Sequence, residues 1–593
     1  MAPIKTIAET INPQAIKETP QINVSQKQEA KIIGELTDKK EKNIKRFMKD
    51  DHTYEADVYP TAIHYLVNGQ WKDIDNSLVD AADEYNVDVL QNKGNSYKVK
   101  IAKNTKANKL VRLQKDQYEL SWNIDGAQQS KAQAVSPDMT KYNALSDNDK
   151  KRTLTNIASE VNFTNFLPDT DLQYEIQPEA VKENIIINKN NSTQQFQFNL
   201  NVKNLTAKLQ DNKSILFYDI NDNSKNIFKI DAPFMIDAAG KKSSDLNMTL
   251  EPSQKGYTLK MIPNSDWLNS PDRVYPIKID PTVGTSLASD AIHDTFISKD
   301  LPNQTNDNSY LLEVGYGSIS GINRTLIKFD IPSLTSADMV IDAKLYLSLY
   351  SANDNVRQID ARNITSGWDS ASVTWNTAPS YDTSRIEDYQ MVQGSAYSDF
   401  AWDITKIVKN WYNTENSNNG IMLMNHDETT GYNEFFSENT DPSYSQYRAQ
   451  VIISYINNSG LEDFWTYHSQ SAGRAGTAYL NDYSGNLSFI HEDLNMDGNL
   501  VPVNIKHVYN ENTKLTDIKY GPGWRLNVSA RVDYNSSLNQ YYYTDEDGTI
   551  HYFTYSSGAY KDEYGADITL VKNADGTYTI KDKQDNVLTF TPS

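Results

Sequence analysis

The sequence predicts an all-β, multidomain protein, and three observations support this prediction. Short aromatic and β-branched segments recur between Asn, Asp, Gly and Lys residues along most of the 593-residue chain, a pattern typical of strands bounded by turns. The residues from Ala343 to Tyr350 alternate between apolar and polar side chains, which is the period of a half-buried antiparallel strand. A chain of this length also exceeds what one hydrophobic core supports, so we expect several domains.

The first half of the chain predicts a tether followed by a β-rich domain. Residues 1–45 are polar and poor in aromatics. They bury too little apolar surface to offset the entropy of ordering, so we expect a flexible or partly helical tether. We expect residues 46–283 to form a β-rich N-terminal domain. Within it, Asn68–Gly69 predicts a hairpin, because both residues tolerate the positive φ angles of a type I′ turn. Prolines cluster between Trp267 and Thr282 and predict a domain boundary just after them.

The second half predicts a sandwich followed by hairpins. Residues 284–457 contain the Ala343–Tyr350 strand, and we expect them to form a jelly-roll-like β-sandwich. In residues 458–593, aromatic strands alternate with Asp-Gly turns at Asp547–Gly548 and Asp575–Gly576. Asp-Gly between such strands is a strong hairpin signal, so an extended antiparallel arrangement is expected here.

The amino-acid composition limits the kinds of partner that this chain is expected to bind. The formal net charge of -21 opposes attraction to phosphate backbones and anionic lipids, so we expect no nucleic-acid partner. No apolar run approaches the roughly 20 residues that span a bilayer, so we expect no membrane insertion. Cysteine is absent, which excludes disulfides and thiolate metal sites within this sequence.

The central region resembles a known module. The segments Asn323–Asp330, Ala343–Tyr350 and Ser372–Pro379 resemble the DNRLRE domain, a β-sandwich module of secreted bacterial proteins that is related to carbohydrate-binding modules. This resemblance implies that the sandwich binds a glycan or a cell-wall polymer.

The flanking regions resemble one family in the same order. His64–Tyr65, Tyr275–Pro281, Gly473–Leu487 and Tyr520–Leu526 look like blocks of wall-associated protein A-like and rearrangement-hotspot (Rhs, YD-repeat) proteins. The resemblance implies an extracellular or cell-wall-associated protein. It also implies that residues 458–593 begin a YD-repeat β-shell, and that a toxin domain follows in the full-length chain and is a partner of this region.

The candidate carbohydrate-binding residues are Trp368, Asp369, Trp402 and Tyr432. Aromatic rings stack on the C–H groups of sugars, and carboxylates accept hydrogen bonds from hydroxyls. The alternative is that these rings pack in the core, since large aromatics bury the most area in β-sandwiches.

Catalysis and metal binding have weaker support. The sequence has no Gly-x-Ser-x-Gly elbow and its eight histidines are scattered singly, so we expect no enzyme. We expect no cofactor either. Asp493, Asn495 and Asp497 have the spacing of calcium ligands and are a weak calcium candidate. The twelfth position is Asn504 instead of a bidentate Glu, which favours a polar hairpin loop.

The sequence therefore predicts a non-enzymatic extracellular surface or delivery region of an Rhs-type toxin or wall-associated protein, with a carbohydrate-binding sandwich. One alternative is a free-standing carbohydrate-binding adhesin, which an immediate stop downstream of Ser593 would support. A second alternative is a polysaccharide-degrading enzyme, which release of reducing ends from glycans would reveal.

Overall fold

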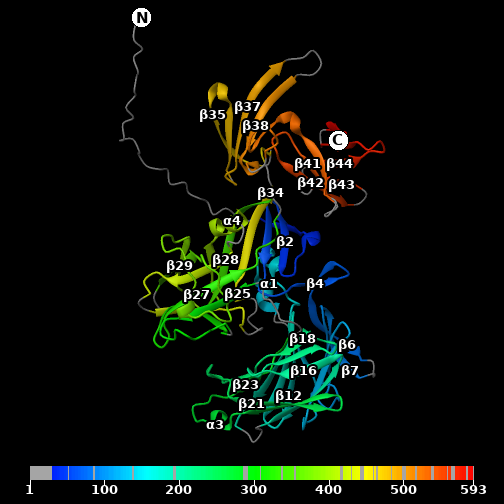
Figure 1. Ribbon diagram of the computed structural model, residues 1–593, viewed down its shortest axis with the longest axis vertical. Coiled ribbons are helices and arrows are strands. Elements are labelled where there is room, and N and C mark those ends of the chain that lie inside the picture. Colours follow the sequence, from blue (N-terminus) through cyan, green and yellow to red (C-terminus); the bar gives the residue numbers. More distant parts are fainter. Residues whose placement is uncertain are drawn as a thin grey trace.

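In the computed structural model the chain forms three β-rich bodies stacked along one long axis (Figure 1). The structure describes residues 30–50, 53–83, 87–136, 139–190, 195–284, 292–307, 309–334, 338–352, 356–413, 418–428, 431–440, 447–457, 460–462, 465–482, 484–496, 503–514, 517–535, 540–556, 559–562, 568–582 and 585–591. The all-β, multidomain prediction is confirmed. The α-helices in these ranges are short: α1 (Met139–Ala144), α2 (Asp147–Arg152), α3 (Ser265–Leu268) and α4 (Thr405–Asn413). None of them is long and apolar enough to cross a membrane.

The N-terminal β-domain consists of two antiparallel sheets that share one core. The first sheet runs, in spatial order, through β21 (Leu246–Ser253), β22 (Gly256–Pro263), β15 (Phe196–Lys203), β10 (Tyr118–Ile124), β9 (Val111–Lys115), β8 (Lys98–Ala102), β7 (Asp88–Gly94) and β6 (Asp75–Ala82). The second runs through β11 (Gln133–Val135), β12 (Ser159–Leu167), β13 (Thr170–Ile176), β14 (Ala180–Ile187), β24 (Val283–Gly284), β18 (Asp222–Ile230), β17 (Ile215–Asp219) and β16 (Leu205–Leu209), with β19 (Phe234–Ile236), β20 (Lys242–Ser243) and β23 (Ile277–Asp280) beside it. Alternating apolar residues of both sheets, such as Trp122, Phe163 and Phe217, are buried in one cluster.

A separate hairpin precedes this domain. β4 (His64–Val67) pairs with β5 (Gln70–Asp73). Asn68 and Gly69 connect them with φ angles of 52° and 78°, as a type I′ turn requires. The hairpin predicted at Asn68–Gly69 is confirmed.

The central sandwich contains strands from two distant parts of the chain. In spatial order these are β1 (Ile32–Glu35), β2 (Ile44–Lys49), β3 (Tyr54–Val58), β34 (Gln450–Asn457), β28 (Asp338–Ala352), β33 (Gly431–Phe436), β26 (Leu311–Gly317), β27 (Gly321–Phe329), β32 (Ile421–Asn425), β29 (Arg357–Asn363) and β30 (Asp388–Val392), with β25 (Ile292–Ser298) on β27 and β31 (Asp399–Asp403) on β28. The long β28 joins both halves, since it pairs with β34 along its first part and with β33 at its end. Ala343, Leu345, Leu347 and Leu349 of β28 are buried in the main core, as the alternation predicted.

The first three strands correct the predicted organisation of the N-terminus. We expected residues 1–45 to be a tether and residue 46 to begin a separate domain. Instead β1 and β2, together with β3, extend the sandwich sheet, because β3 pairs with β34 from Tyr54 to Val58. The residues of the predicted tether before Ala30 lie outside the described part of the chain.

Buried ion pairs hold these strands against the N-terminal β-domain. Glu55 of β3 is fully buried, and Arg152 at the end of α2 donates to both of its carboxylate oxygens at 2.6 and 2.8 Å. Lys49 lies 2.6 Å from the same carboxylate. Buried charges need such partners, so this network ties the two bodies together.

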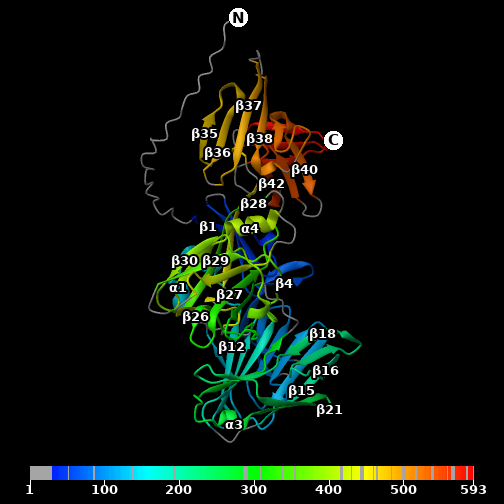
Figure 2. The ribbon, with the colours of Figure 1, turned by 60° about the vertical axis from the view of Figure 1, so that its left-hand side comes forward.

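The C-terminal body consists of two antiparallel sheets of consecutive strands (Figure 2). The first sheet contains β35 (Tyr467–Ser471), β36 (Thr477–Asn481), β37 (Leu487–Met496), β38 (Val503–Asn510) and β39 (Trp524–Leu526). The second contains β40 (Arg531–Asn535), β41 (Gln540–Thr544), β42 (Ile550–Ser556), β43 (Ala559–Asp562), β44 (Thr569–Lys572), β45 (Tyr578–Lys581) and β46 (Val587–Phe590). Asp547–Gly548 and Asp575–Gly576 lie between β41 and β42 and between β44 and β45, as predicted.

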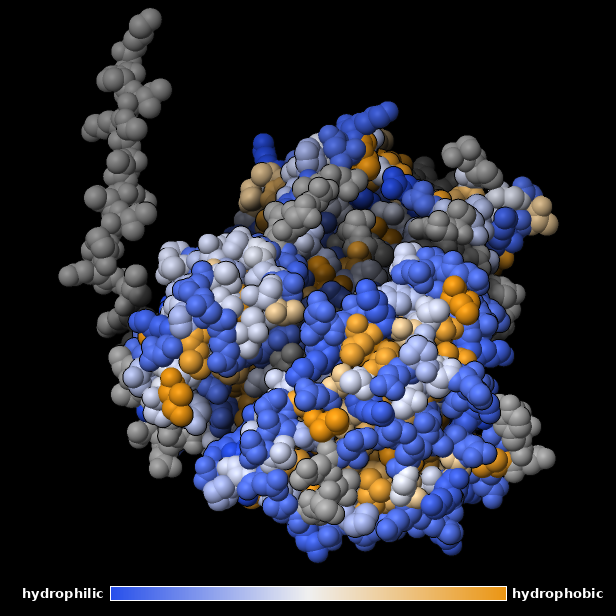
Figure 3. Space-filling model, turned by 60° about the horizontal axis from the view of Figure 1, so that its bottom comes forward, coloured by the Kyte–Doolittle hydropathy of each residue, from blue (hydrophilic) through white to orange (hydrophobic). Residues whose placement is uncertain are grey.

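The surface of the end that carries the N-terminal β-domain is mainly polar. Figure 3 shows hydrophobic residues there as separate patches among hydrophilic ones. Exposed large apolar side chains such as Ile220, Ile262 and Val274 belong to different segments. Exposed apolar residues that are scattered singly are ordinary on protein surfaces, so those described in this view need no binding partner to explain them.

Candidate functional site

The four predicted sugar-binding residues do not share one surface. Trp402 on β31 is fully buried, lies opposite Leu345 in the β28–β31 register, and donates its indole N–H to the Ile359 carbonyl at 3.0 Å. Its ring packs edge-on against Phe435, 5.9 Å between centroids. A ring enclosed on all sides cannot stack on a sugar, so the prediction for Trp402 is wrong and this residue belongs to the core.

Trp368 and Asp369 lie in a loop that covers the outer face of the sheet containing β27 and β32. Trp368 is half-buried, packs against a small apolar cluster that includes Met422, and donates its indole N–H to the Asn419 carbonyl at 2.7 Å. Asp369 is exposed, and its side chain accepts from the Ala371 N–H at 3.0 Å. The contacts of both residues order this loop.

The same loop also packs onto a charged residue. Arg324 of β27 lies 4.9 Å from the centroid of the Trp375 ring and forms two hydrogen bonds with the Glu428 carboxylate, at 2.7 and 2.9 Å. Because the Arg324 guanidinium already has a carboxylate partner and an aromatic ring to stack on, it stabilises the packing of this loop on the sheet. Trp375 therefore helps to cover the outer face of the sheet.

Tyr432 belongs to a different surface, which we call the β33 strip. It consists of Tyr432, Glu434 and Phe436 on β33, Glu313 on β26, Tyr350 on β28, and Tyr397 and Tyr447 from the adjoining loops. Alternate residues of a strand lie on one face, which aligns the three β33 residues. Glu313 is directly opposite Glu434 in the β26–β33 register.

Three tyrosine rings surround Phe436 at one end of the β33 strip. The Phe436 side chain is buried, with Tyr350 edge-on at 5.4 Å and Tyr397 and Tyr447 stacked near it at 5.9 and 5.2 Å between centroids. Tyr350 and Tyr397 remain 44% and 45% exposed. The buried phenylalanine therefore supports rings that face solvent, which is the arrangement a stacking platform needs.

The backbone at Tyr397 is in a conformation that bulky residues rarely adopt. Its φ angle is 72°, in the left-handed region. Two backbone hydrogen bonds hold it: the Tyr397 N–H donates to the Leu349 carbonyl at 2.7 Å, and the Leu349 N–H donates to the Ser398 carbonyl at 2.8 Å. Such conformations concentrate at binding sites, where the surroundings enforce them.

Two half-buried carboxyl groups adjoin the rings. Burial, and then the negative charge of Glu434, raise the pKa of Glu313. Burial also raises the pKa of Glu434, while a hydrogen bond from Ser351 opposes the shift. The charge of Glu434 raises the pKa of the Tyr432 hydroxyl. The β33 strip thus combines exposed rings with acidic hydrogen-bonding groups.

Sequence reasoning found only part of this strip. Tyr432 was selected, and the alternation of residues 343–350 places Tyr350 on the polar face. Nothing in the sequence signals that Tyr397 and Tyr447, fifty residues apart, stack on Phe436.

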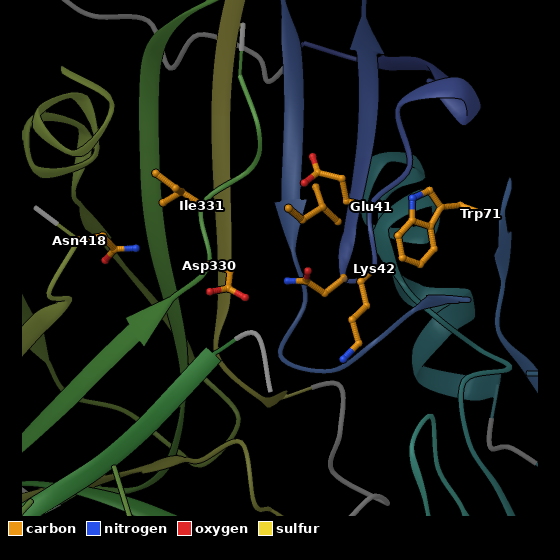
Figure 4. A pocket seen from close by; sticks show the side chains of 8 residues that line it. Glu41, Lys42, Trp71, Asp330, Ile331 and Asn418 are labelled. Atoms are coloured by element: carbon orange, nitrogen blue, oxygen red, sulfur yellow. The ribbon is translucent and has the colours of Figure 1, made fainter. Parts of the chain in front are cut away.

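A pocket of about 530 Å³ lies between the sandwich and the N-terminal strands. Figure 4 shows Asp330, Ile331 and Asn418 on one side and Glu41, Lys42 and Trp71 on the other. Lys42 pairs with Glu179 at 2.9 Å, and Glu41 accepts from the Ser333 hydroxyl at 2.9 Å. Glu41 and Lys42 therefore have structural roles at this joint between the sandwich and the β4–β5 hairpin.

The first two residues of the calcium candidate lie in a strand and not in a loop. Asp493 and Asn495 lie within β37, and Asn495 pairs with Asn504 of β38. The Asp493 carboxylate accepts from His507 at 2.5 Å. An extended strand keeps successive ligand positions apart, so these residues do not converge as calcium ligands must. Asp497 lies outside the described residues.

Two family models match parts of the chain. Residues 286–449 match carbohydrate-binding module family 96, and this range includes every residue of the β33 strip. Residues 480–553 match the domain of unknown function DUF6531, which is associated with YD repeats.

Curated relatives match along most of the chain. The protein named tRNA nuclease WapA of Bacillus subtilis (strain 168) is 26% identical over 414 residues, 66% of this chain and 16% of the relative. The tRNA3(Ser)-specific nuclease WapA of Bacillus spizizenii is 24% identical over 461 residues, 74% of this chain and 18% of the relative. The matched part of this chain thus spans about a sixth of the length of these relatives.

These relatives correct two predictions. We expected no enzyme, but the relatives are named as nucleases, so that expectation is contradicted. We also expected no nucleic-acid partner, and this exclusion loses its support because tRNA is the substrate in the relatives' names. Net charge describes only the sequence at hand and does not decide the partners of a longer protein.

The predicted resemblance is confirmed by the order of the matches. The match to carbohydrate-binding module family 96 precedes the match to a YD-repeat-associated domain, and the WapA relatives align with 66% and 74% of the chain. In these matches the chain is similar to wall-associated, Rhs-like proteins that contain a carbohydrate-binding module.

Proposed function

We propose that the central sandwich binds a neutral polysaccharide along the β33 strip. The observation that carries this proposal is the pair of exposed rings, Tyr350 and Tyr397, supported from below by Phe436. The match to carbohydrate-binding module family 96 supports the ligand class. The rings provide apolar faces for sugar C–H groups, and Glu313, Glu434 and the tyrosine hydroxyls provide hydrogen bonds to sugar hydroxyls.

The charge of the strip favours a neutral polymer over an anionic one. Glu313 and Glu434 face each other across two strands, and the whole chain carries a net charge of -21. A uronic acid or phosphate polymer would add a third negative charge beside two carboxyl groups whose ionisation burial already opposes. Neutral hydroxyls instead accept and donate hydrogen bonds with either form of the carboxyl group.

Affinity electrophoresis of the 593-residue protein in gels containing neutral or anionic polysaccharides tests this proposal. We expect retardation by a neutral polymer, and a loss of affinity of about tenfold or more when Tyr350→Ala and Tyr397→Ala are combined. Tyr389→Ala is the matched control, because Tyr389 is 52% exposed on β30 outside the strip. Equal retardation of all three proteins would refute the assignment of the site.

The paired carboxyl groups favour glycoside hydrolysis as a second candidate. Residues directly opposite each other on antiparallel strands have Cβ atoms about 5 Å apart, and two carboxyl groups with at least one raised pKa are the groups that glycosidases use. Glu434→Gln separates the two functions, because it keeps the rings and removes one acid. Release of reducing ends by the unchanged protein, abolished in this variant, would establish hydrolysis; no release from any retained polymer would exclude it.

We further propose that the full-length protein is located outside the cell or at the wall and delivers a tRNA-cleaving domain, by analogy with the names of its relatives. Fractionation of producing cells, and incubation of tRNA with the protein made from its complete gene, test these two statements separately. Wall association without tRNA cleavage would support the adhesin alternative.

A further inference from the structure

A second cluster of polar side chains lies where the sandwich meets the C-terminal body. Glu462 follows β34, Asp545 lies in the turn after β41, His551 is on β42 and Asp562 ends β43. Their side chains are 14%, 20%, 5% and 1% exposed. Strand β42 lies next to the end of the sandwich in both ribbon views (Figures 1 and 2).

The first three residues have the spacing of ligands around one ion. His551 Nε2 lies 3.4 Å from Asp545 Oδ2 and 3.6 Å from Glu462 Oε1. All three ligand atoms lie within 4.8 Å of one another. Zinc holds imidazole nitrogen and carboxylate oxygen at about 2.0–2.2 Å in a tetrahedron, which separates the ligand atoms by about 3.3–3.6 Å. The spacing from His551 to the two carboxylates therefore fits a tetrahedral ion.

The other ring nitrogen of His551 faces a fourth carboxylate. His551 Nδ1 lies 4.0 Å from Asp562 Oδ2. In metal sites, a carboxylate commonly lies behind the ligating imidazole and orients its ring. This arrangement is independent of the spacing on the Nε2 side, and it indicates the same use of the histidine.

Carboxyl groups outnumber basic groups in this cluster. Among the described residues, Glu462, Asp545, Asp547 and Asp562 supply four carboxyl groups, and two basic groups, His551 and Arg525, oppose them. Arg525 donates to the backbone carbonyl of Asp545 at 3.4 Å. Burial favours the protonated form of such carboxyl groups, and a bound cation takes the place of those protons.

A comparable group near the N-terminus lacks this imbalance. Glu35, His64 and Asp73 also lie close together. There the Lys40 ammonium lies 2.6 Å from Asp73 and 3.3 Å from Glu35, so a lysine already supplies the positive charge. The contrast singles out the cluster around His551.

We propose that Glu462, Asp545 and His551 bind a divalent cation of the zinc type, with Asp562 orienting the imidazole. The ion connects the segment after the sandwich to the β41–β42 hairpin. Two hydrogen bonds already join these parts: the Gly460 N–H donates to the Thr549 hydroxyl at 2.7 Å and the Leu461 N–H donates to Asp547 at 2.6 Å. A cation at this joint fixes how the C-terminal body is held on the sandwich.

Calorimetric titration of the chelator-treated 593-residue protein with ZnCl₂ tests the proposal. We expect one equivalent bound, an affinity at least tenfold lower in Glu462→Gln and His551→Gln, and about tenfold lower in Asp562→Asn. His507→Gln is the matched control, since His507 pairs with Asp493 at 2.5 Å in the neighbouring sheet, and we expect its affinity to be unchanged.

Three results would overturn the proposal. They are no binding at all, binding unchanged in Glu462→Gln, or binding lost in His507→Gln, which would place the ion at Asp493. Tighter binding of Ca²⁺ or Mg²⁺ than of Zn²⁺ would contradict the role of the imidazole, since those ions prefer oxygen ligands. Glu462 lies outside the strands, so we expect the Glu462→Gln variant to fold. It therefore tests the proposal even if the His551→Gln variant does not fold.

Discussion

Replacing Glu183 by glutamine should stabilise the N-terminal β-domain at neutral pH. Glu183 lies on β14 with 2% of its surface exposed, and its carboxyl group accepts the indole N–H of Trp122 at 2.9 Å. Burial raises the pKa of Glu183 from an ordinary value of 4.5 to about 8, although hydrogen bonds from Tyr174 and Trp122 oppose the shift. Glutamine keeps an oxygen for Trp122 and has no charge to bury.

The magnitude follows from proton linkage. The pKa of Glu183 is raised in the folded state. The free energy of unfolding that its bound proton contributes is therefore complete below pH 4.5 and is lost as the pH rises towards 8. At about 1.4 kcal/mol per pH unit, the folded protein loses roughly 3 kcal/mol by pH 7 and at most about 5 kcal/mol above pH 8. The Gln variant avoids this loss, so its advantage should grow over that interval.

Native-state hydrogen exchange on peptides from β10 and β14 measures the stability of this domain without requiring the whole chain to unfold in one step. Glu160→Gln on β12 of the same sheet is the control, because Glu160 is only half-buried. If the protection of the unchanged protein and of Glu183→Gln fell in parallel between pH 5 and 8, the burial argument would be refuted.

Three further predictions concern the sandwich and the C-terminal body. Arg152→Ala leaves Glu55 buried without its guanidinium partner. It should lower the free energy of unfolding by about 3–5 kcal/mol, seen as a lower thermal midpoint. Arg385→Ala is the control, because it removes only an exposed partner of Glu387 and should change the midpoint little. Trp402→Ala should lower the free energy of unfolding by about 3–5 kcal/mol, because it creates a core cavity. The affinity of the folded protein for polysaccharide should not change. A loss of affinity without a loss of stability would instead identify Trp402 as a ligand residue. Gly476→Ala should disrupt the β36–β37 hairpin, since the φ of Gly476 is 127° and a Cβ would lie 2.1 Å from the Ile490 carbonyl oxygen. In the control Gly473→Ala the new Cβ would meet nothing within 4 Å, so this change should cost only about 1–2 kcal/mol. Equal thermal midpoints for the two variants would contradict the steric argument.

Local patterns predicted the strands well, since their causes lie within a few residues. The turn at Asn68–Gly69 and the inward leucines of β28 follow from allowed φ angles and from the period of two. The same period places Trp402 inward, between Phe400 and Ile404, but a tryptophan can either fill a core or stack on a ligand, so its residue type does not exclude sugar binding.

Long-range pairing was not predictable in the same way. Residues 39–49 are rich in basic residues, as solvated segments often are, but Arg46 and Lys49 are buried. Their acidic and aromatic partners come from other strands: Lys49 pairs with Glu55, and Arg46 lies over the ring of Tyr455. A charge run cannot reveal a partner four hundred residues away.

The pairing of β3 with β34 has a mechanical consequence. The chain leaves the sandwich after Val58 and returns at Ile292, so the N-terminal β-domain is an insertion within the sandwich. Tension between an anchor at the N-terminal end of the described chain and a load after β34 would act across the ladders that join β1 to β2, β2 to β3 and, last, β3 to β34. The inserted domain is therefore shielded from force until the last of these ladders separates.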